Sequence, residues 1–112
     1  MMFVTGPMYS GQQEYVMERM GWSREELERR CALEVQRLAP GTQDLEALAD
    51  ELAAYPVVVA CEMGGGVVPV DPEERRTREA AGRLACLLAQ RADTVVRLVC
   101  GLPQILKQPH GD

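Results

Sequence analysis

Hydrophobic and polar positions along the chain fall into two patterns, short apolar runs and longer amphipathic segments. The apolar runs predict three strands, at Met2–Thr5, Val57–Cys61 and Thr94–Cys100. Between them, apolar residues recur at helical spacing and predict helices over 12–20, 24–39, 45–54 and 72–92. A continuous β-branched run is typical of a strand covered on both faces, so we expect helices on both sides of the sheet.

Boundary signals support these helices. Ser23 and Glu26 have the spacing of a capping box, in which each side chain bonds a backbone N–H group of the other residue. Asp71 followed by Pro72 forms a natural N-cap and first helical residue, and Gly21 ends the first helix. The helix that Ser23 opens is expected to end at Pro40-Gly41 and to carry four apolar residues at helical spacing, Leu27, Cys31, Val35 and Leu38.

Strands that alternate with helices imply parallel pairing through right-handed crossovers. We therefore expect one α/β domain over residues 1–112, a small three-layer fold with a three-stranded parallel sheet flanked by helices. The segment from Gly101 onward is expected to be a loop with a polar end. Ligands of such sheets bind beyond the carboxyl ends of the strands, which directs attention to the loops that follow the first two strands.

Composition narrows the classes of function. The 112 residues carry a net charge of −5, whereas a nucleic-acid partner favours a basic surface, so no nucleic-acid binding is expected. No apolar run approaches the roughly 20 residues of a membrane-spanning helix, and no signal-peptide pattern opens the chain. These features predict a cytoplasmic protein without membrane attachment.

The cysteine pattern favours reduced thiols over a metal site. No C-x-x-C pair is present, and the single histidine, His110, lies in a polar tail, so we expect no metal site. The thiols are expected to be buried and to behave as small hydrophobic groups. The cysteines are Cys31, Cys61, Cys86 and Cys100.

The loop after the first strand has the frame of a phosphate-binding loop. Gly6 and Gly11 are separated by four residues, the last of them Ser10, and a helix opens directly after them. In G-x-x-x-x-G-K-[ST], backbone N–H groups cradle phosphates, the lysine reaches the terminal phosphates and the hydroxyl binds Mg²⁺. Gln12 and Gln13 occupy the lysine and hydroxyl positions here, which predicts a degenerate P-loop NTPase-like domain.

A second glycine loop follows the second strand, at Gly64, Gly65 and Gly66. Since both loops follow parallel strands, we expect them at one edge of the sheet, forming a pocket. Glu62 precedes the glycines and is the candidate catalytic residue, as a magnesium ligand or a base that positions water. The alternatives are a loop acid held by backbone N–H groups, and glycines that only supply positive φ angles.

The second half of the chain resembles a known family. Val57-Val-Val-Ala-Cys-Glu-Met-Gly-Gly-Gly-Val-Val-Pro69 is similar to the segment N-E-V-G-x-G-I-V-P of the adenosylcobinamide kinase/adenosylcobinamide-phosphate guanylyltransferase family. Arg78-Glu79, Gly82-Arg83, Ala92-Asp93 and Gly101-Leu-Pro103 continue the likeness, and Val4-Thr5-Gly6 with Ser10-Gly11 matches its phosphate loop. The resemblance implies a P-loop fold, a nucleotide such as GTP or ATP with Mg²⁺, a corrinoid substrate and assembly as a homo-oligomer.

The departures from the family leave the activity open. Gln12 and Gln13 replace its lysine and serine, and the chain has no counterpart of the histidine that carries GMP. Residues 21–55 stand in place of a longer family segment, so it is left undecided whether the protein is an enzyme. Three hypotheses remain: a shortened relative with weakened or lost nucleotide binding and catalysis, a non-catalytic interaction or regulatory subunit of corrinoid metabolism, and a small nucleotide-dependent enzyme of another substrate that uses Glu62.

Overall fold

A five-stranded sheet lies at the centre of the part of the chain that the structure describes, with the strand order β2-β3-β1-β4-β5. The structure is a computed structural model and describes residues 1–63 and 71–109. The strands are β1 (Met2–Thr5), β2 (Cys31–Ala32), β3 (Val57–Val59), β4 (Thr94–Val99) and β5 (Leu102–Lys107). The first four run parallel and β5 runs antiparallel to β4.

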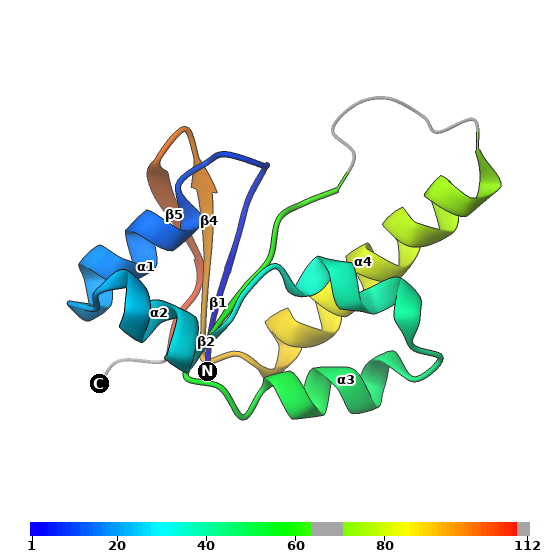
Figure 1. Cartoon of the computed structure of the whole chain (residues 1–112), viewed down its shortest axis with the longest axis horizontal. Coiled ribbons are helices and arrows are strands. Elements are labelled where there is room, and N and C mark those ends of the chain that lie inside the picture. The colour runs from blue at the N-terminus through cyan, green and yellow to red at the C-terminus, as the bar shows by residue number, and fades with distance from the viewer. Residues whose placement is uncertain (64–70, 110–112) are drawn as a thin grey trace.

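Helices cover the two faces of this sheet (Figure 1). The first face carries α1 (Gln12–Met20) and α2 (Arg24–Arg30). The second face carries the 3₁₀ helix η1 (Val35–Gly41), α3 (Leu45–Leu52) and α4 (Pro72–Arg91). The three-layer α/β arrangement is therefore confirmed. Within the described ranges, no helix is long and apolar enough to cross a membrane.

Alternating strand residues supply two separate cores, one on each face. Val4 and Leu98 pack with Val16 of α1 and Leu27 of α2, and these four side chains are fully buried. On the other face, Phe3 and neighbouring residues pack against α3 and α4. Burying one such large side chain stabilises the fold by about 1.5–3 kcal/mol. Because residues of the same strands take part in both cores, these strands hold both helical layers.

The predicted helix boundaries are confirmed at three positions. The Ser23 hydroxyl accepts from the backbone N–H of Glu26 at 3.1 Å, and the Glu26 carboxylate accepts from the N–H of Ser23 at 3.3 Å. Asp71 caps α4 by accepting from the backbone N–H of Glu73 at 3.0 Å. Gly21 ends α1 in the left-handed conformation, with φ at 69°.

The predicted continuous helix over 24–39 is wrong, because the chain leaves helical geometry at Cys31. Cys31 has φ −109° and ψ 148°, pairs with β3 and begins the short strand β2. Leu27 lies in the core on the α1 face, whereas Val35 lies in the core on the α4 face. One straight helix cannot bury both residues on opposite sides of a sheet, so the segment crosses the sheet edge as a strand and re-forms as η1.

The predicted loop after Gly101 is also wrong, and it makes the expected three-stranded sheet too small. Val99 pairs with Leu102, so Cys100 and Gly101 form a two-residue hairpin turn, and their φ values are 52° and 77°. Two successive positive φ angles are typical of the type I′ turn, whose twist matches that of the strands it joins. With β2 and β5 added, the sheet has five strands.

The carboxyl ends of β1 and β3 lie side by side at one edge of the sheet. The helix that follows β1 covers one face and the helix that follows β3 covers the other, which is the arrangement that opens a crevice in α/β sheets. The N–H of Glu62 donates to the carbonyl of Gly6 at 2.8 Å, so the segments that follow β3 and β1 are in direct contact. The glycines at 64–66 lie outside the described residues.

Candidate functional site

The loop between β1 and α1 packs closely against β4 and is tied to the turn that follows β4. Gly6 has φ 146°, and a Cβ added there would lie 2.3 Å from the carbonyl oxygen of Leu98 on β4, so only glycine fits. Gly11 caps α1 in the left-handed conformation without a side-chain bond. The N–H of Gly101 donates to the carbonyl of Ser10 at 3.0 Å, which ties the β4–β5 turn to the loop.

Gln12 occupies the inside of this loop. Its side chain is buried, and Nε2 donates to the carbonyls of Gly6 at 3.0 Å and Pro7 at 2.9 Å. Carbonyl oxygens only accept, so they fix the amide with its nitrogen toward the loop. Both amide hydrogens are then directed at main-chain carbonyls, and Oε1 is an acceptor that offers nothing to an anion.

Gln13 points toward the neighbouring helix α2. Its Oε1 accepts from Nη1 of Arg24 at 3.1 Å, on the exposed side of α1. In the full motif a hydroxyl at this position holds Mg²⁺. An amide oxygen that is already bonded to a guanidinium does not fit that task. Gln12 and Gln13, at the positions of the charged and the metal-binding side chains of phosphate loops, therefore have other roles here.

A cavity of about 300 Å³ opens beside the loop, and we call it the loop-side cavity. Its far wall comes from the segment after β2, where Glu34 has φ 55° and lies in the left-handed region that side chains rarely adopt. Glu34 accepts from Nε2 of Gln36 at 2.7 Å and pairs with Arg37 at 3.8 Å. Two carboxylates therefore border this cavity, Glu14 of α1 and Glu34. The sequence did not point to Glu34, because its pattern predicted a helix there.

Cys61 connects the loop with Glu34. Its thiol lies 3.9 Å from Nε2 of Gln12 and donates to Glu34 at 3.7 Å, while its N–H donates to the side chain of Gln36 at 2.9 Å. Burial is the main cause that raises the pKa of this thiol, and the Glu34 charge adds to it. A protonated thiol is a weak nucleophile, so Cys61 serves this cluster as a packed, weakly polar contact.

Glu62, the predicted catalytic carboxylate, faces the other side of the sheet. Its oxygens accept from Nε and Nη2 of Arg97 on β4 at 2.6 and 2.8 Å, a bidentate pair. The hydrogen bonds from Arg97 lower the pKa of Glu62 against the opposing effect of burial. The carboxylate is a poor base in this state, and a catalytic role for it stays a prediction.

The structure therefore brings together one group of predicted residues and separates another. The loop residues lie around the start of α1, with Gln12 and Gln13 on the wall of the loop-side cavity. Glu62 is joined to the loop by its backbone bond to Gly6, and its side chain is bonded to Arg97 on β4. These loop residues are Gly6, Ser10, Gly11, Gln12 and Gln13.

Comparison with known protein families identifies the family of the chain. The sequence model of the cobinamide kinase / cobinamide phosphate guanyltransferase family matches residues 12–106. The chain belongs to this family. Its match to cobinamide kinase / cobinamide phosphate guanyltransferase sequences begins at Gln12 and contains Glu34, Cys61 and Glu62. No curated protein matches the chain at a significant level.

Proposed function

We propose that this member of the cobinamide kinase / cobinamide phosphate guanyltransferase family binds nucleotide phosphate weakly through its main chain and does not transfer it. The position of Gln12 carries this proposal. The amide is hydrogen-bonded to the carbonyls of Gly6 and Pro7, so a neutral group stands where the family chemistry needs a cation. The main-chain cradle and the start of α1, where Gly11 makes no side-chain cap, remain suited to an anion.

The expected loss of affinity follows from the missing charge. A hydrogen bond to a charged group contributes about 1.5–3 kcal/mol, against about 1 kcal/mol for a neutral one. Binding of GTP or ATP is therefore weaker by about tenfold or more than in a loop with lysine. Catalysis loses more, because phosphoryl transfer depends on cations that stabilise the charge of the transition state.

The proposal extends to the second family reaction. Guanylyl transfer, as the family resemblance implies it, needs a histidine nucleophile, and the single histidine of the sequence is His110, outside the described residues and beyond the matched span. We therefore expect no covalent GMP adduct. A corrinoid remains a candidate ligand by family membership, with binding in place of turnover.

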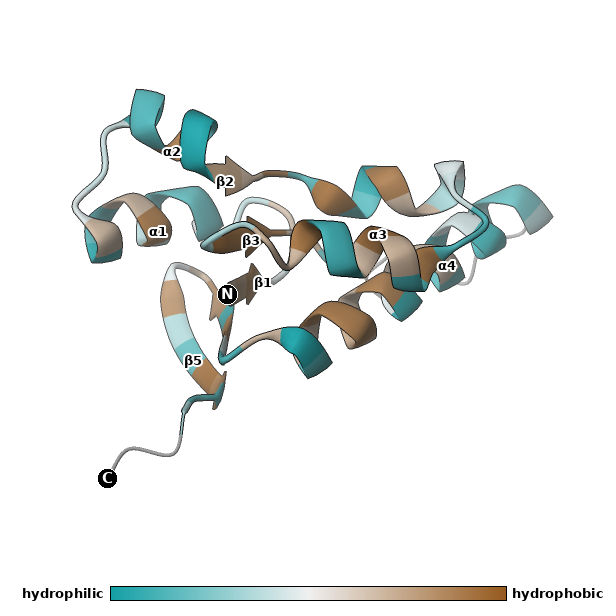
Figure 2. Cartoon of the chain, turned by 90° about the horizontal axis from the view of Figure 1, so that it is seen from below, coloured by the Kyte–Doolittle hydropathy of each residue, from teal (hydrophilic) through white to brown (hydrophobic). Residues whose placement is uncertain are grey.

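The exposure of strand β5 supports a second proposal, that the chain associates with copies of itself. All six of its residues are exposed, among them Leu102 at 71% and Leu106 at 56%. Figure 2 shows β5 at the margin of the molecule, as the last strand of the sheet, with Lys107 at its end bonded to the carbonyls of Ala89 and Gln90 on α4. A free strand edge can pair with its own copy across a two-fold axis, so we propose that the chain forms homo-oligomers through β5.

Calorimetric titration tests the nucleotide proposal. GTP and ATP are titrated with and without Mg²⁺ into the natural chain and into the double variant Gln12→Lys with Gln13→Ser. We expect weak binding to the natural chain that changes little with Mg²⁺, and at least about tenfold tighter binding with a clear Mg²⁺ dependence in the variant. The control Gln43→Lys adds the same charge at an exposed position of the α3 entry.

The outcomes separate the hypotheses. Tight, Mg²⁺-dependent binding or phosphoryl transfer by the natural chain would contradict the proposal. Hydrolysis that disappears in Glu62→Gln would support an enzyme of another substrate. Equal gains in the double variant and in Gln43→Lys would show a general charge effect and no functional loop.

A further inference from the structure

One oxygen of the buried residue Gln12 has no donor bonded to it in the part of the chain that the structure describes. Only 5% of Gln12 is exposed, and its Nε2 is bonded to the carbonyls of Gly6 and Pro7, which leaves Oε1 without a partner. Among the described residues, no side-chain oxygen is both sealed from solvent and unbonded, so Oε1 faces accessible space. The space that Gln12 lines is the loop-side cavity.

A carboxylate stands close to this amide on the wall of the same cavity. The Oε2 atom of Glu34 accepts from Gln36 and pairs with Arg37, whereas its Oε1 accepts from the thiol of Cys61 at 3.7 Å, a weak donor. The same thiol lies 3.9 Å from Nε2 of Gln12. The acceptors of Glu34 and Gln12 therefore lie at neighbouring points of the wall, and each has room for a further donor.

The charges around the loop-side cavity favour a cation. Glu14 and Glu34 border it with negative charge, and Arg37 borders it with positive charge. The side chain of Arg37 is 75% exposed and lies 3.8 Å from the Glu34 carboxylate, and such an exposed pair contributes at most about 1 kcal/mol. Arg37 therefore leaves most of the negative field of Glu34 available to a ligand.

We propose that the loop-side cavity binds a small primary amine in its protonated form. An ammonium group has three N–H donors and no acceptor, so one such group can bond Oε1 of Gln12 and the carboxylate of Glu34 together. The body of the amine lies against Val59, which lines the cavity from the core of the α1 face. An apolar cavity of about 150 Å³ is large enough for benzene, so about 300 Å³ holds a ring with an aminomethyl group.

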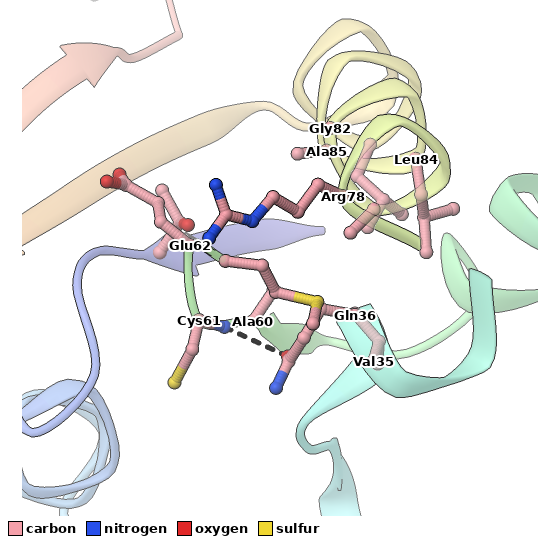
Figure 3. A pocket seen from close by; sticks show the side chains of 13 residues that line it. Val35, Gln36, Ala60, Cys61, Glu62, Arg78, Gly82, Leu84 and Ala85 are labelled. Carbon is pink, nitrogen blue, oxygen red and sulfur yellow. Dashed lines mark hydrogen bonds between the residues drawn. The ribbon is translucent and has the colours of Figure 1, made fainter. Parts of the chain in front are cut away.

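This amine site is separate from the α4 face of the sheet and does not depend on nucleotide binding. Figure 3 shows the side chains of Cys61 and Glu62 extending to opposite sides of the strand end, with the N–H of Cys61 bonded to Gln36. The amine uses side-chain acceptors, whereas a phosphate would use main-chain N–H groups of the loop. Failure of one proposal therefore leaves the other standing.

Titration followed by NMR amide shifts tests the site with benzylamine and its neutral analogue benzyl alcohol, at neutral pH and without nucleotide. We expect benzylamine to shift the amides of Gln12, Glu34 and Cys61, with a dissociation constant of about 1 mM, as for other ligands of this size. The amides of Ala81 and Ala85 on α4 should stay in place. Benzyl alcohol should shift the same cavity amides with about tenfold lower affinity, because its hydroxyl carries no charge.

Two variants separate the charge of the site from its amide oxygen. Glu34→Gln keeps the shape and an acceptor, and it should weaken benzylamine about tenfold while changing benzyl alcohol much less. Gln12→Met removes Oε1 and should weaken both probes, with its spectrum reporting that it is folded. The control Glu28→Gln removes the same charge from an exposed position of α2 and should change neither.

Each contrary outcome overturns a named part of the proposal. Absence of cavity shifts at about 20 mM benzylamine, well above the expected constant, would remove the site. Equal affinities for benzylamine and benzyl alcohol would overturn the assignment of a cation. Unchanged benzylamine binding in Gln12→Met would overturn the role of its oxygen, and equal losses in Glu34→Gln and Glu28→Gln would assign the effect to the net charge of the chain.

Discussion

At the scale of single residues, an amide and an ammonium group at position 12 have opposite consequences for the loop. A lysine has three donors, so it can bond loop carbonyls and still present charge to a phosphate. Gln12 has two donors, and the Gly6 and Pro7 carbonyls lie within bonding distance of its nitrogen. The side chain thereby stabilises the loop without supplying a cation.

Replacing Gln12 by alanine should destabilise the fold. The carbonyl of Pro7 would lose its partner, whereas that of Gly6 keeps the N–H of Glu62. We expect the free energy of unfolding to fall by about 1–3 kcal/mol, because the half-buried Pro7 carbonyl loses its hydrogen bond and a buried side chain is removed. Urea unfolding measures it, and Gln13→Ala, which loses only an exposed contact, should change it by less than about 0.5 kcal/mol. Equal losses in both variants would contradict the bonded position of Gln12.

The cysteines should differ in reactivity toward a thiol reagent at pH 8. Cys86 and Cys100 are exposed and should react first. Burial raises the pKa of Cys31 from 9.0 to about 11, so it should stay protected until the chain unfolds. Because the folded pKa is the higher one, this thiol also costs stability as the pH rises from 9 toward 11. Rapid reaction of Cys31 in the native protein would contradict its burial in the core of the α1 face.

The Glu62–Arg97 pair should make stability depend on pH in the acid range. The pair lowers the pKa of Glu62 below its usual 4.5, so its contribution is present above that pH and is lost as the pH falls through the lower folded value. Thermal unfolding between pH 3 and 6 should therefore vary less in Glu62→Gln. The control Glu51→Gln changes an exposed glutamate of α3 and should keep the natural slope.

At the scale of elements, the sequence predicted those features whose two partners lie within a few residues of each other. The cap of α2 joins Ser23 to Glu26, three residues away, and both could be recognised from their spacing. Strand β2 has only two residues, and its partner is β3, 26 residues further along the chain. No local pattern announces such a strand, so Glu34 could not be placed at the candidate site from the sequence.

Two glycine-to-alanine changes should have opposite effects on stability. Gly6 has φ 146°, and a Cβ there would lie 2.3 Å from a backbone oxygen of β4, so Gly6→Ala should cost about 3 kcal/mol or more. Gly82 lies within α4, where an added Cβ meets nothing within 4 Å, so Gly82→Ala should stabilise the helix by up to about 1 kcal/mol. Thermal unfolding of both variants measures the contrast, and a tolerated Gly6→Ala would contradict the close approach of the loop to β4.

At the scale of the whole molecule, the sheet places on opposite faces two groups of residues that the sequence predicts in one pocket. The predicted pocket combined the Gly6–Gly11 loop with the Gly64–Gly66 loop, since both follow parallel strands, and it placed Glu62 beside the second loop. The strand exits do meet, but successive residues of an extended chain point to opposite faces, so Cys61 joins the loop side and Glu62 the α4 side. The sequence therefore predicted the edge of the sheet at which these residues lie. The face to which each side chain points became clear only from the strand pairing in the structure.

The exposed strand β5 leads to a prediction about assembly. Lysine on an edge strand opposes pairing with another edge. Leu106→Lys should therefore shift the chain from an oligomer toward the monomer in sedimentation experiments, while its fold is kept because the side chain is 56% exposed. Leu38→Lys is the matched control, since Leu38 on η1 is 49% exposed and lies outside β5, and it should leave the distribution unchanged. A natural chain that is monomeric at high concentration would contradict association, and equal dissociation in both variants would place the interface away from β5.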